Sequence, residues 1–400
     1  MQIIHAEVIF TCDENFTILR DYAVAFDEKI RLIAPLKEAQ KLYRAAPVTH
    51  AQILTPALIN AHTHLEFSAN KAEFSYGEFS NWLKSIVNSC IQVDPATRVN
   101  AAAAALKEML KSGVGTFGEI SSFGSEAQIC AKSGARVVFF VEILGSNPQA
   151  LTQNANFFDS RLEAAFALKS PLFTPAVAIH SPYSTHPQLA AHALKAATQN
   201  NLVTSAHFLE SKAELDWLQT ASGALKNHLL SLNPTATPFY TPREFLALFK
   251  GRHTLLTHCV FADEFFDEFE ENFFVTHCPR SNRLLGQKRL DITRLKRFAL
   301  ATDSLSSNYS LNLFDELRAA LLTHATQPLN ELAQQLFCAV TRDAAKALNL
   351  DNGVIKVGKL ADFATFLNTA KNDDILLNLV LNTTQAEQVF VGGREILSQI

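Results

Sequence analysis

The chain has 400 residues, of which 48% are hydrophobic and 18% are charged, and its formal net charge at pH 7 is −4. These values predict a globular protein with a sizeable core, exclude a disordered chain, and offer no basic field that would attract nucleic acid. Because no hydrophobic run reaches the roughly 18 residues of a membrane span, we expect a cytoplasmic protein that has no membrane partner.

Short hydrophobic strands are predicted at both ends of the chain. They cover residues 3–11, 21–26, 29–34, 360–367 and 388–396. The strands near the start need a partner to cover them, and the similar strands near the end offer one. We therefore predict that residues 1–53 and 355–400 form one small composite β-sandwich domain, which a central domain of residues 54–354 interrupts.

The central part of the chain alternates predicted strands with helix-like segments such as residues 97–112 and 187–199. The predicted strands are residues 54–64, 113–120, 136–144, 173–180, 202–207, 254–258, 273–277 and 298–303. Eight such repeats in about 300 residues predict an α/β fold, a (β/α)8 TIM barrel, rather than an open sheet. In such a barrel the active site lies where the C-terminal ends of the strands converge.

Histidine and aspartate side chains end several of these predicted strands. Side chains two apart in a strand share a face, so His62 and His64 project from the same side and can bind one metal ion. His207 and Asp303 end two further strands. Three nitrogen ligands and one oxygen ligand suit Zn²⁺ or Fe²⁺ and leave room for a water molecule, which the ion would activate as a nucleophile.

Two more residues are candidates for catalysis. Glu210 follows His207 by three residues, close enough to carry a proton, and His258 ends another predicted strand, where it can hold or polarise a hydroxide. Each candidate has a structural alternative, because polar side chains also occur at barrel ends that bind no metal. That alternative requires coincidences at several strand ends at once, so we favour a metal-dependent hydrolase.

Five motifs, in order along the chain, carry a resemblance to a known family. They are Asn60-Ala61-His62-Thr63-His64, His207-Phe208-Leu209-Glu210, Thr257-His258-Cys259-Val260, His277-Cys278-Pro279-Arg280-Ser281-Asn282 and Thr302-Asp303-Ser304-Leu305-Ser306-Ser307-Asn308. Together they resemble the amidohydrolase superfamily, in the branch of chlorohydrolases and of nucleoside and nucleobase deaminases. Within that branch, residues 62–68 and 79–83 are most similar to the aminofutalosine deaminases of menaquinone-making bacteria.

The resemblance implies one divalent metal ion, Zn²⁺ or Fe²⁺, because the predicted strand 173–180 lacks the lysine that two-metal members carboxylate. It also implies hydrolytic deamination of a purine nucleoside, in which activated water attacks C6 of an adenine ring, Glu210 moves the proton and ammonia leaves. In that scheme His258 and Asp303 orient the hydroxide. The residues expected to bind the substrate are Glu66, Trp82, His180 and Arg280.

The substrate that the resemblance favours is 6-amino-6-deoxyfutalosine, with adenosine, methylthioadenosine and S-adenosylhomocysteine as further candidates. One alternative is another amidohydrolase, such as a guanine or cytosine deaminase or a chlorohydrolase. A non-catalytic barrel scaffold is the other alternative, and it should have lost metal ligands or the proton carrier, which are all present. Glu66 could instead hold a neighbouring loop, and Arg280 could be a solvated loop arginine. The oligomeric state stays open, with a homodimer among the options.

Overall fold

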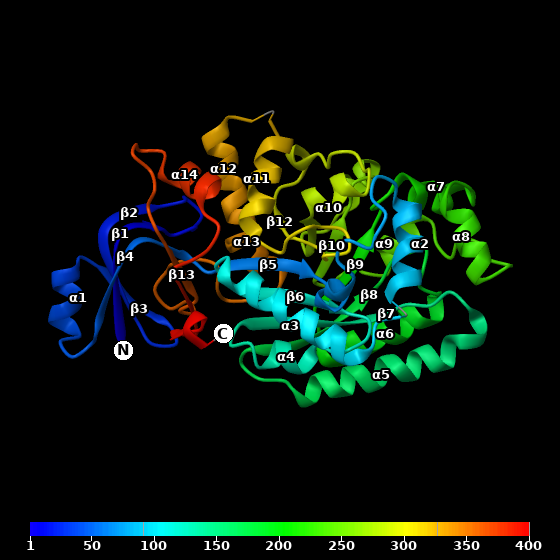
Figure 1. Cartoon of the computed structure of the whole chain (residues 1–400), viewed down its shortest axis with the longest axis horizontal. Helices are drawn as coiled ribbons and strands as arrows, with labels where there is room; N and C mark the ends of the chain where they lie inside the picture. Colours follow the sequence, from blue (N-terminus) through cyan, green and yellow to red (C-terminus); the bar gives the residue numbers. More distant parts are fainter. Residues whose placement is uncertain (91, 326, 400) are drawn as a thin grey trace.

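The computed structural model describes residues 1–90, 92–325 and 327–399, and its strands form two sheets (Figure 1). In the larger sheet, eight parallel strands pair with one another in chain order. These strands are β5 (Leu58–Thr63), β6 (Val114–Ser121), β7 (Arg136–Ile143), β8 (Phe173–Ile179), β9 (Thr204–Phe208), β10 (Thr254–His258), β11 (Phe273–His277) and β12 (Phe298–Leu300).

Hydrogen bonds between the segments at β5 and after β12 close this sheet into a barrel. The side-chain amide of Asn60 donates to the Thr302 hydroxyl at 2.8 Å, and the Thr302 backbone N–H donates back to the Asn60 side-chain oxygen at 3.1 Å. One residue further on, the Asp303 N–H donates to the His62 carbonyl at 3.1 Å. The predicted TIM barrel is therefore confirmed.

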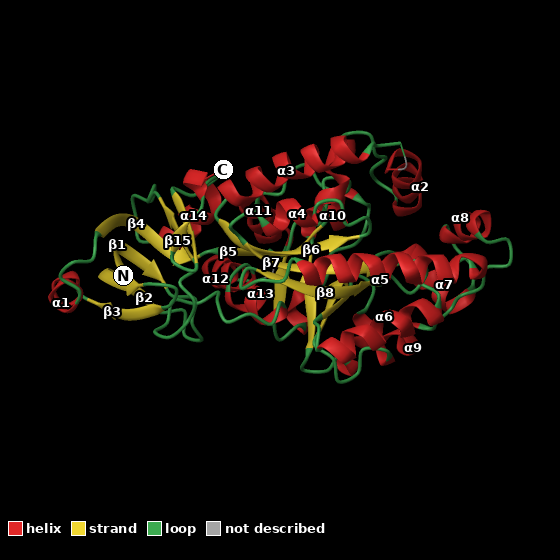
Figure 2. Ribbon diagram, turned by 90° about the horizontal axis from the view of Figure 1, so that it is seen from below, coloured by secondary structure: helices red, strands yellow, loops and turns green. Residues whose placement is uncertain are grey.

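Helices cover the outside of the barrel, and the smaller sheet lies at one end of the molecule (Figure 2). The two helices predicted from sequence correspond to α3 and α6. Asp94 caps the start of α3 by accepting the N–H groups of Ala96 and Thr97. The helices from this region are α2 (Phe79–Cys90), α3 (Pro95–Lys111), α4 (Ala127–Ala131), α5 (Leu151–Ala167), α6 (Pro187–Asn200), α7 (Lys212–Thr220), α8 (Leu225–Leu232), α9 (Pro242–Ala247), α10 (Pro279–Leu284), α11 (Leu313–Thr323), α12 (Leu329–Ala339) and α13 (Arg342–Ala347).

The smaller sheet combines both ends of the chain, in the order β15-β14-β13-β4-β1-β2-β3. Two short helices accompany it, α1 (Leu36–Leu42) and α14 (Ile375–Asn382). Its strands are β1 (Gln2–Phe10), β2 (Ile18–Phe26), β3 (Ile30–Ala34), β4 (Val48–Pro56), β13 (Phe363–Phe366), β14 (Gln388–Val391) and β15 (Arg394–Glu395).

This terminal sheet curls until its two halves face each other. In the strand order, β2 is three places from β13, which in a flat sheet would separate them by about 14 Å. The ring of Phe26 nevertheless lies 5.2 Å from the ring of Phe363 and 5.8 Å from that of Phe390, centroid to centroid. The predicted sandwich is therefore one continuous mixed sheet that folds back over an aromatic core.

The strand predicted over residues 54–64 is wrong in one respect, because the structure divides it at Ala57. Residues up to Pro56 belong to β4, which pairs with β1 and β13 in the terminal sheet, whereas β5 of the barrel begins at Leu58. Residues 53–59, on both sides of this division, are buried and mostly apolar, so hydrophobicity alone does not reveal the change of sheet. The predicted domain limits, 1–53 with 355–400 and 54–354, stay a prediction, and β4 runs across the first of them.

Within the part of the chain that the structure describes, no helix combines the length and the apolar character that crossing a membrane demands.

A buried ion pair joins the barrel to the terminal sheet. The Arg136 guanidinium donates to both carboxylate oxygens of Asp362, at 3.0 and 3.1 Å, and only 8% and 1% of the two side chains is exposed. We expect Asp362→Ala to lower the free energy of unfolding by about 3 to 5 kcal/mol, because it leaves the arginine buried without its partner. Equilibrium urea denaturation measures this loss.

The matched control is Asp159→Ala, which removes the carboxylate of the surface pair with His192. That pair is well exposed, so its loss should cost less than about 1 kcal/mol. Equal losses in the two variants would contradict the importance of the buried pair.

Candidate functional site

Three buried imidazoles meet at the C-terminal end of the barrel strands and form a histidine cluster. It consists of His62 on β5, His64 directly after β5, and His207 on β9. One nitrogen from each ring lies within 4.8 Å of the others, and the Nε2 atoms of His62 and His64 are 3.1 Å apart. Two ligands bound to the same tetrahedral Zn²⁺ lie about 3.3 Å apart, so this spacing fits one shared ion.

In His207 and His62, a neighbouring oxygen contacts Nδ1 and leaves Nε2 free to bind an ion. The Nδ1 atom of His207 lies 2.8 Å from the His180 carbonyl, which can only accept, so this Nδ1 carries the proton. The Nδ1 atom of His62 lies 3.2 Å from the Thr257 hydroxyl. Burial lowers the pKa of His62 well below its usual value and that of His64 to about 3, so these rings are neutral. Neutral imidazoles with an oriented proton are the usual metal-binding form.

Asp303 places a carboxylate beside the histidine cluster. One carboxylate oxygen lies 3.9 and 3.8 Å from the Nε2 atoms of His62 and His64. The other oxygen accepts hydrogen bonds from the hydroxyls of Ser281 and Ser307, at 2.7 and 2.8 Å. Burial acts to raise the pKa of Asp303, but the neighbouring histidines outweigh it, so the pKa lies below its usual value. The donor set therefore fits one divalent cation bound by three nitrogens and one oxygen.

Glu210 and His258 lie beside this set. Oε1 of Glu210 is buried, has no hydrogen-bond partner among the described residues, and lies 3.5 Å from Nε2 of His258. Burial raises the pKa of Glu210 well above its usual value, and the carboxylates of Asp303 and Glu214 add to this effect. A carboxyl group that binds protons more tightly than usual is suited to proton transfer.

The backbone at the strand ends is held in an uncommon conformation. Leu209, His258, Cys259 and Asp303 all have positive φ angles, of 48°, 71°, 51° and 58°. Such angles are strained for residues other than glycine, and they are concentrated at functional sites. Hydrogen bonds hold part of this strained backbone in place. The carboxylate of Glu214 accepts them from the N–H groups of Leu209 and Glu210, at 3.0 and 2.9 Å.

Two adjoining cavities open from the cluster, an inner cavity of about 70 Å³ and an outer cavity of about 490 Å³. The outer cavity is mainly apolar, and α2, α5 and α8 contribute to its wall. The inner cavity is lined by His64, Phe67, Trp82, Leu83, Ile86, His180, Tyr183, His207, Glu210, His258, Asp303, Ser304 and Ser306. The aromatic side chains of the outer cavity are Phe67, Phe123, Phe157 and Tyr183.

Two of the four predicted substrate-binding residues line these cavities. Trp82 lines the inner cavity, and its indole N–H donates to the Ser306 carbonyl at 2.9 Å. His180 lines both cavities, and its Nδ1 lies 2.5 Å from the Ser184 hydroxyl.

Glu66 and Arg280 are not among the residues that line either cavity. The carboxylate of Glu66 accepts the N–H groups of Ser122 and Phe123, each at 2.9 Å, and so holds the loop after β6. The buried guanidinium of Arg280 donates to the Glu316 carboxylate at 2.8 Å and also to the carbonyls of two residues, Ser310 and Asn312. The structure thus corrects the expectation for Arg280, because its donors already have partners within the chain.

Sequence reasoning missed several residues that shape the site. Ser281 and Asn282 belong to a quoted motif but received no role, and only their hydrogen bonds to Asp303 and His258 reveal one. Phe123 and Phe157 come from a loop and from the surface of α5, where no motif marks them. Spacing in the sequence could not have found these aromatic residues.

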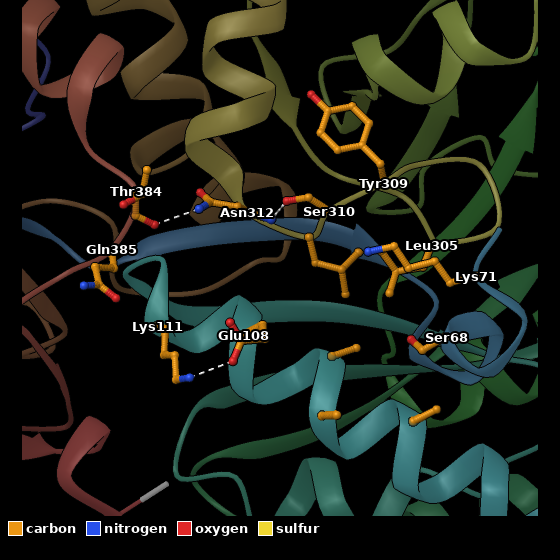
Figure 3. Close-up of a pocket in the computed structure, with 14 residues that line it drawn as sticks. Ser68, Lys71, Glu108, Lys111, Leu305, Tyr309, Ser310, Asn312, Thr384 and Gln385 are labelled. Carbon is orange, nitrogen blue, oxygen red and sulfur yellow. Dashed lines mark hydrogen bonds and ion pairs between the residues drawn. The ribbon is translucent and has the colours of Figure 1, made fainter.

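A third cavity, of about 610 Å³, lies between α3 and the segment that follows β12 (Figure 3). Lys111 and Glu108 form an ion pair along its α3 side. None of the described residues that line this cavity belongs to the predicted site. The chemistry therefore belongs to the inner and outer cavities.

Comparisons with known proteins agree with this geometry. The profile of the amidohydrolase family matches residues 53–396. An aminodeoxyfutalosine deaminase from Nitratiruptor sp. is 38% identical over 95% of this chain and 96% of its own length, and an adenosine deaminase from Helicobacter pylori is 37% identical over 99% and 100%.

A solved structure of Helicobacter pylori aminofutalosine deaminase in complex with methylthio-coformycin superimposes with a TM-score of 0.91. It is 36% identical and covers 99% of this chain and 100% of its own. The predicted resemblance and the predicted class of enzyme, a hydrolase, are confirmed. A family profile that matches most of the chain, together with relatives that match it over nearly its whole length, shows that this chain belongs to the amidohydrolase family.

Proposed function

We propose that this amidohydrolase is a metal-dependent hydrolytic deaminase of adenine nucleosides, and that it converts 6-amino-6-deoxyfutalosine to futalosine in menaquinone biosynthesis. The observation that carries the proposal is the outer cavity, which adjoins the buried histidine cluster and is lined mainly by apolar and aromatic side chains. Adenosine would leave much of that cavity unfilled, whereas a nucleoside with an aromatic substituent at the ribose 5′ position would fill more of it. The names of the relatives support the same substrate class.

In the reaction, water adds to C6 of the adenine ring and ammonia leaves. A divalent ion, Zn²⁺ or Fe²⁺, bound by the histidine cluster and Asp303 would supply an acidified water as the nucleophile. Glu210 takes one proton from the water and delivers it to ring nitrogen N1. It then passes the remaining proton of the new C6 hydroxyl to the amino group, which leaves as ammonia when the C6–N bond breaks. His258 and Asp303 orient the water beside Glu210, within the buried cavity where such polar interactions are strongest.

The two cavities suggest how the nucleoside binds. Trp82 and His180 line the inner cavity, which we assign to the reacting edge of the adenine base. The ribose and its 5′ substituent then extend into the outer cavity, with the substituent against Phe123 and Phe157. A cavity of about 490 Å³ is within the usual size range for small-molecule sites.

Loss of the histidine cluster should remove the metal ion. We expect His207→Ala to lose the roughly one ion per chain that the wild-type protein binds, together with all deaminase activity. Elemental analysis of the purified protein and an ammonia-release assay measure the two effects. His192→Ala, on the outer face of α6, is the control and should keep both. Full metal content in His207→Ala would contradict the assignment of this ligand.

Glu210→Gln should separate metal binding from proton transfer. The amide keeps the shape of the side chain but cannot carry the proton, so kcat should fall by about 10²- to 10⁴-fold with the metal content unchanged. Glu264→Gln, an exposed change outside both cavities, is the control. An unchanged kcat in Glu210→Gln would exclude the proposed role.

The outer cavity should decide substrate preference. Phe157 is 48% exposed, so Phe157→Ala should fold normally. It should raise KM for 6-amino-6-deoxyfutalosine by about tenfold, since an aromatic contact is lost, and leave the KM for adenosine unchanged. Leu322→Ala, at a 78% exposed position on α11, is the control. Wild-type protein that prefers adenosine would instead favour an adenosine deaminase.

A further inference from the structure

Behind His258, on the side away from Glu210, a chain of buried polar side chains leads to α11. Nδ1 of His258 lies 2.9 Å from the Asn282 side-chain oxygen, and the Asn282 amide nitrogen lies 3.4 Å from Nδ1 of His277. Nε2 of His277 in turn lies 3.0 Å from Nε2 of His324, the residue that follows α11. All four side chains belong to residues that are at most 3% exposed.

The amide of Asn282 gives this chain a direction, because its oxygen can only accept and its nitrogen can only donate. Asn282 therefore donates to Nδ1 of His277, which must present a lone pair. Burial lowers the pKa of His277 well below its usual value and that of His324 to about 4, so each ring is neutral and carries one proton. The proton of His277 is then on Nε2, from which it is donated to His324.

We propose that Asn282, His277 and His324 are positioning residues, which hold His258 in the tautomer that carries its proton on Nδ1. The Nε2 lone pair of His258 then faces Glu210 and Asp303, whose nearest oxygens lie 3.5 and 3.9 Å away.

This tautomer matters for the chemistry, and the inference here rests on the proposed deaminase function. An Nε2 lone pair can accept a hydrogen bond from the attacking water and leave the Glu210 carboxylate free to take the other proton. The opposite tautomer would donate its Nε2–H to a carboxylate and reduce the ability of Glu210 to accept a proton. Asn282, His277 and His324 thus act on catalysis through His258 and do not touch the substrate.

A substitution at His324, the outer end of this series of hydrogen bonds, can reverse the direction in which the bonds run. Lysine at position 324 can only donate, so His324→Lys forces Nε2 of His277 to accept and moves the His277 proton to Nδ1. The Asn282 amide must then turn over, and its nitrogen donates to Nδ1 of His258, whose proton moves to Nε2. An ionised glutamate can only accept, so His324→Glu preserves the original direction.

The experiment reads the tautomer directly, by ¹⁵N–¹H NMR of histidine-labelled, metal-loaded protein at neutral pH, with the signal of His258 identified from its loss in His258→Gln. In wild-type protein and in His324→Glu we expect the proton of His258 on Nδ1. In His324→Lys we expect it on Nε2, with kcat lowered about 10- to 100-fold and KM and metal content unchanged.

Several outcomes would overturn the inference. A wild-type spectrum with the His258 proton on Nε2 would overturn it. This measurement needs no variant, so it decides the question even if His324→Lys fails to fold. Wild-type kcat in a folded His324→Lys would also overturn it. Wild-type protein that keeps the proton on Nδ1 but deaminates no purine nucleoside would instead overturn the proposed function and leave the tautomer assignment in place.

Discussion

The site depends on the contact that closes the barrel between β5 and the segment after β12. Asn60 and Thr302, which are 242 positions apart in sequence, exchange two hydrogen bonds, and the next residue, Asp303, bonds through its N–H to the His62 carbonyl. Since His62 and Asp303 lie on opposite sides of this seam, the carboxylate meets the imidazoles only when the barrel is closed. Folding of the whole chain is therefore a condition for bringing these groups together.

Burial of so many ionisable groups in one place is costly, and the surrounding chain offsets the cost with fixed polar partners. Two serine hydroxyls and the Ser304 N–H hold the Asp303 carboxylate. The carboxylate of Glu214 holds the backbone that presents Glu210. The positive φ angles of His258 and Asp303 add backbone strain to this cost. Groups that are oriented before the substrate arrives need no reorganisation during the reaction, which is the main electrostatic advantage of an enzyme site.

The sequence predicts the barrel because eight apolar strands alternate with helix-like segments, and it predicts the site because several of these strands end in histidine or aspartate. It merged two strands into one across Ala57, because one apolar run passes from one sheet into the other. It could not assess Arg280, since the partner that occupies its guanidinium, Glu316, lies 36 positions away with no motif around it. The same holds for His324, whose contact with His277 exists only in three dimensions.

The two cavities separate the chemistry of the site from its choice of substrate. The histidine cluster, Glu210, His258 and Asp303 lie at or just beyond the strand ends, where the closed barrel fixes them. Part of the outer wall instead comes from α2, α5 and α8, which lie around the barrel and contribute no side chain to the histidine cluster. Changes in those helices can therefore alter the group accepted at the ribose 5′ position without disturbing the ligands, so one barrel can serve several nucleosides. The cavities share six lining residues, and these are where the two functions meet: His64, Phe67, Leu83, Ile86, His180 and Tyr183.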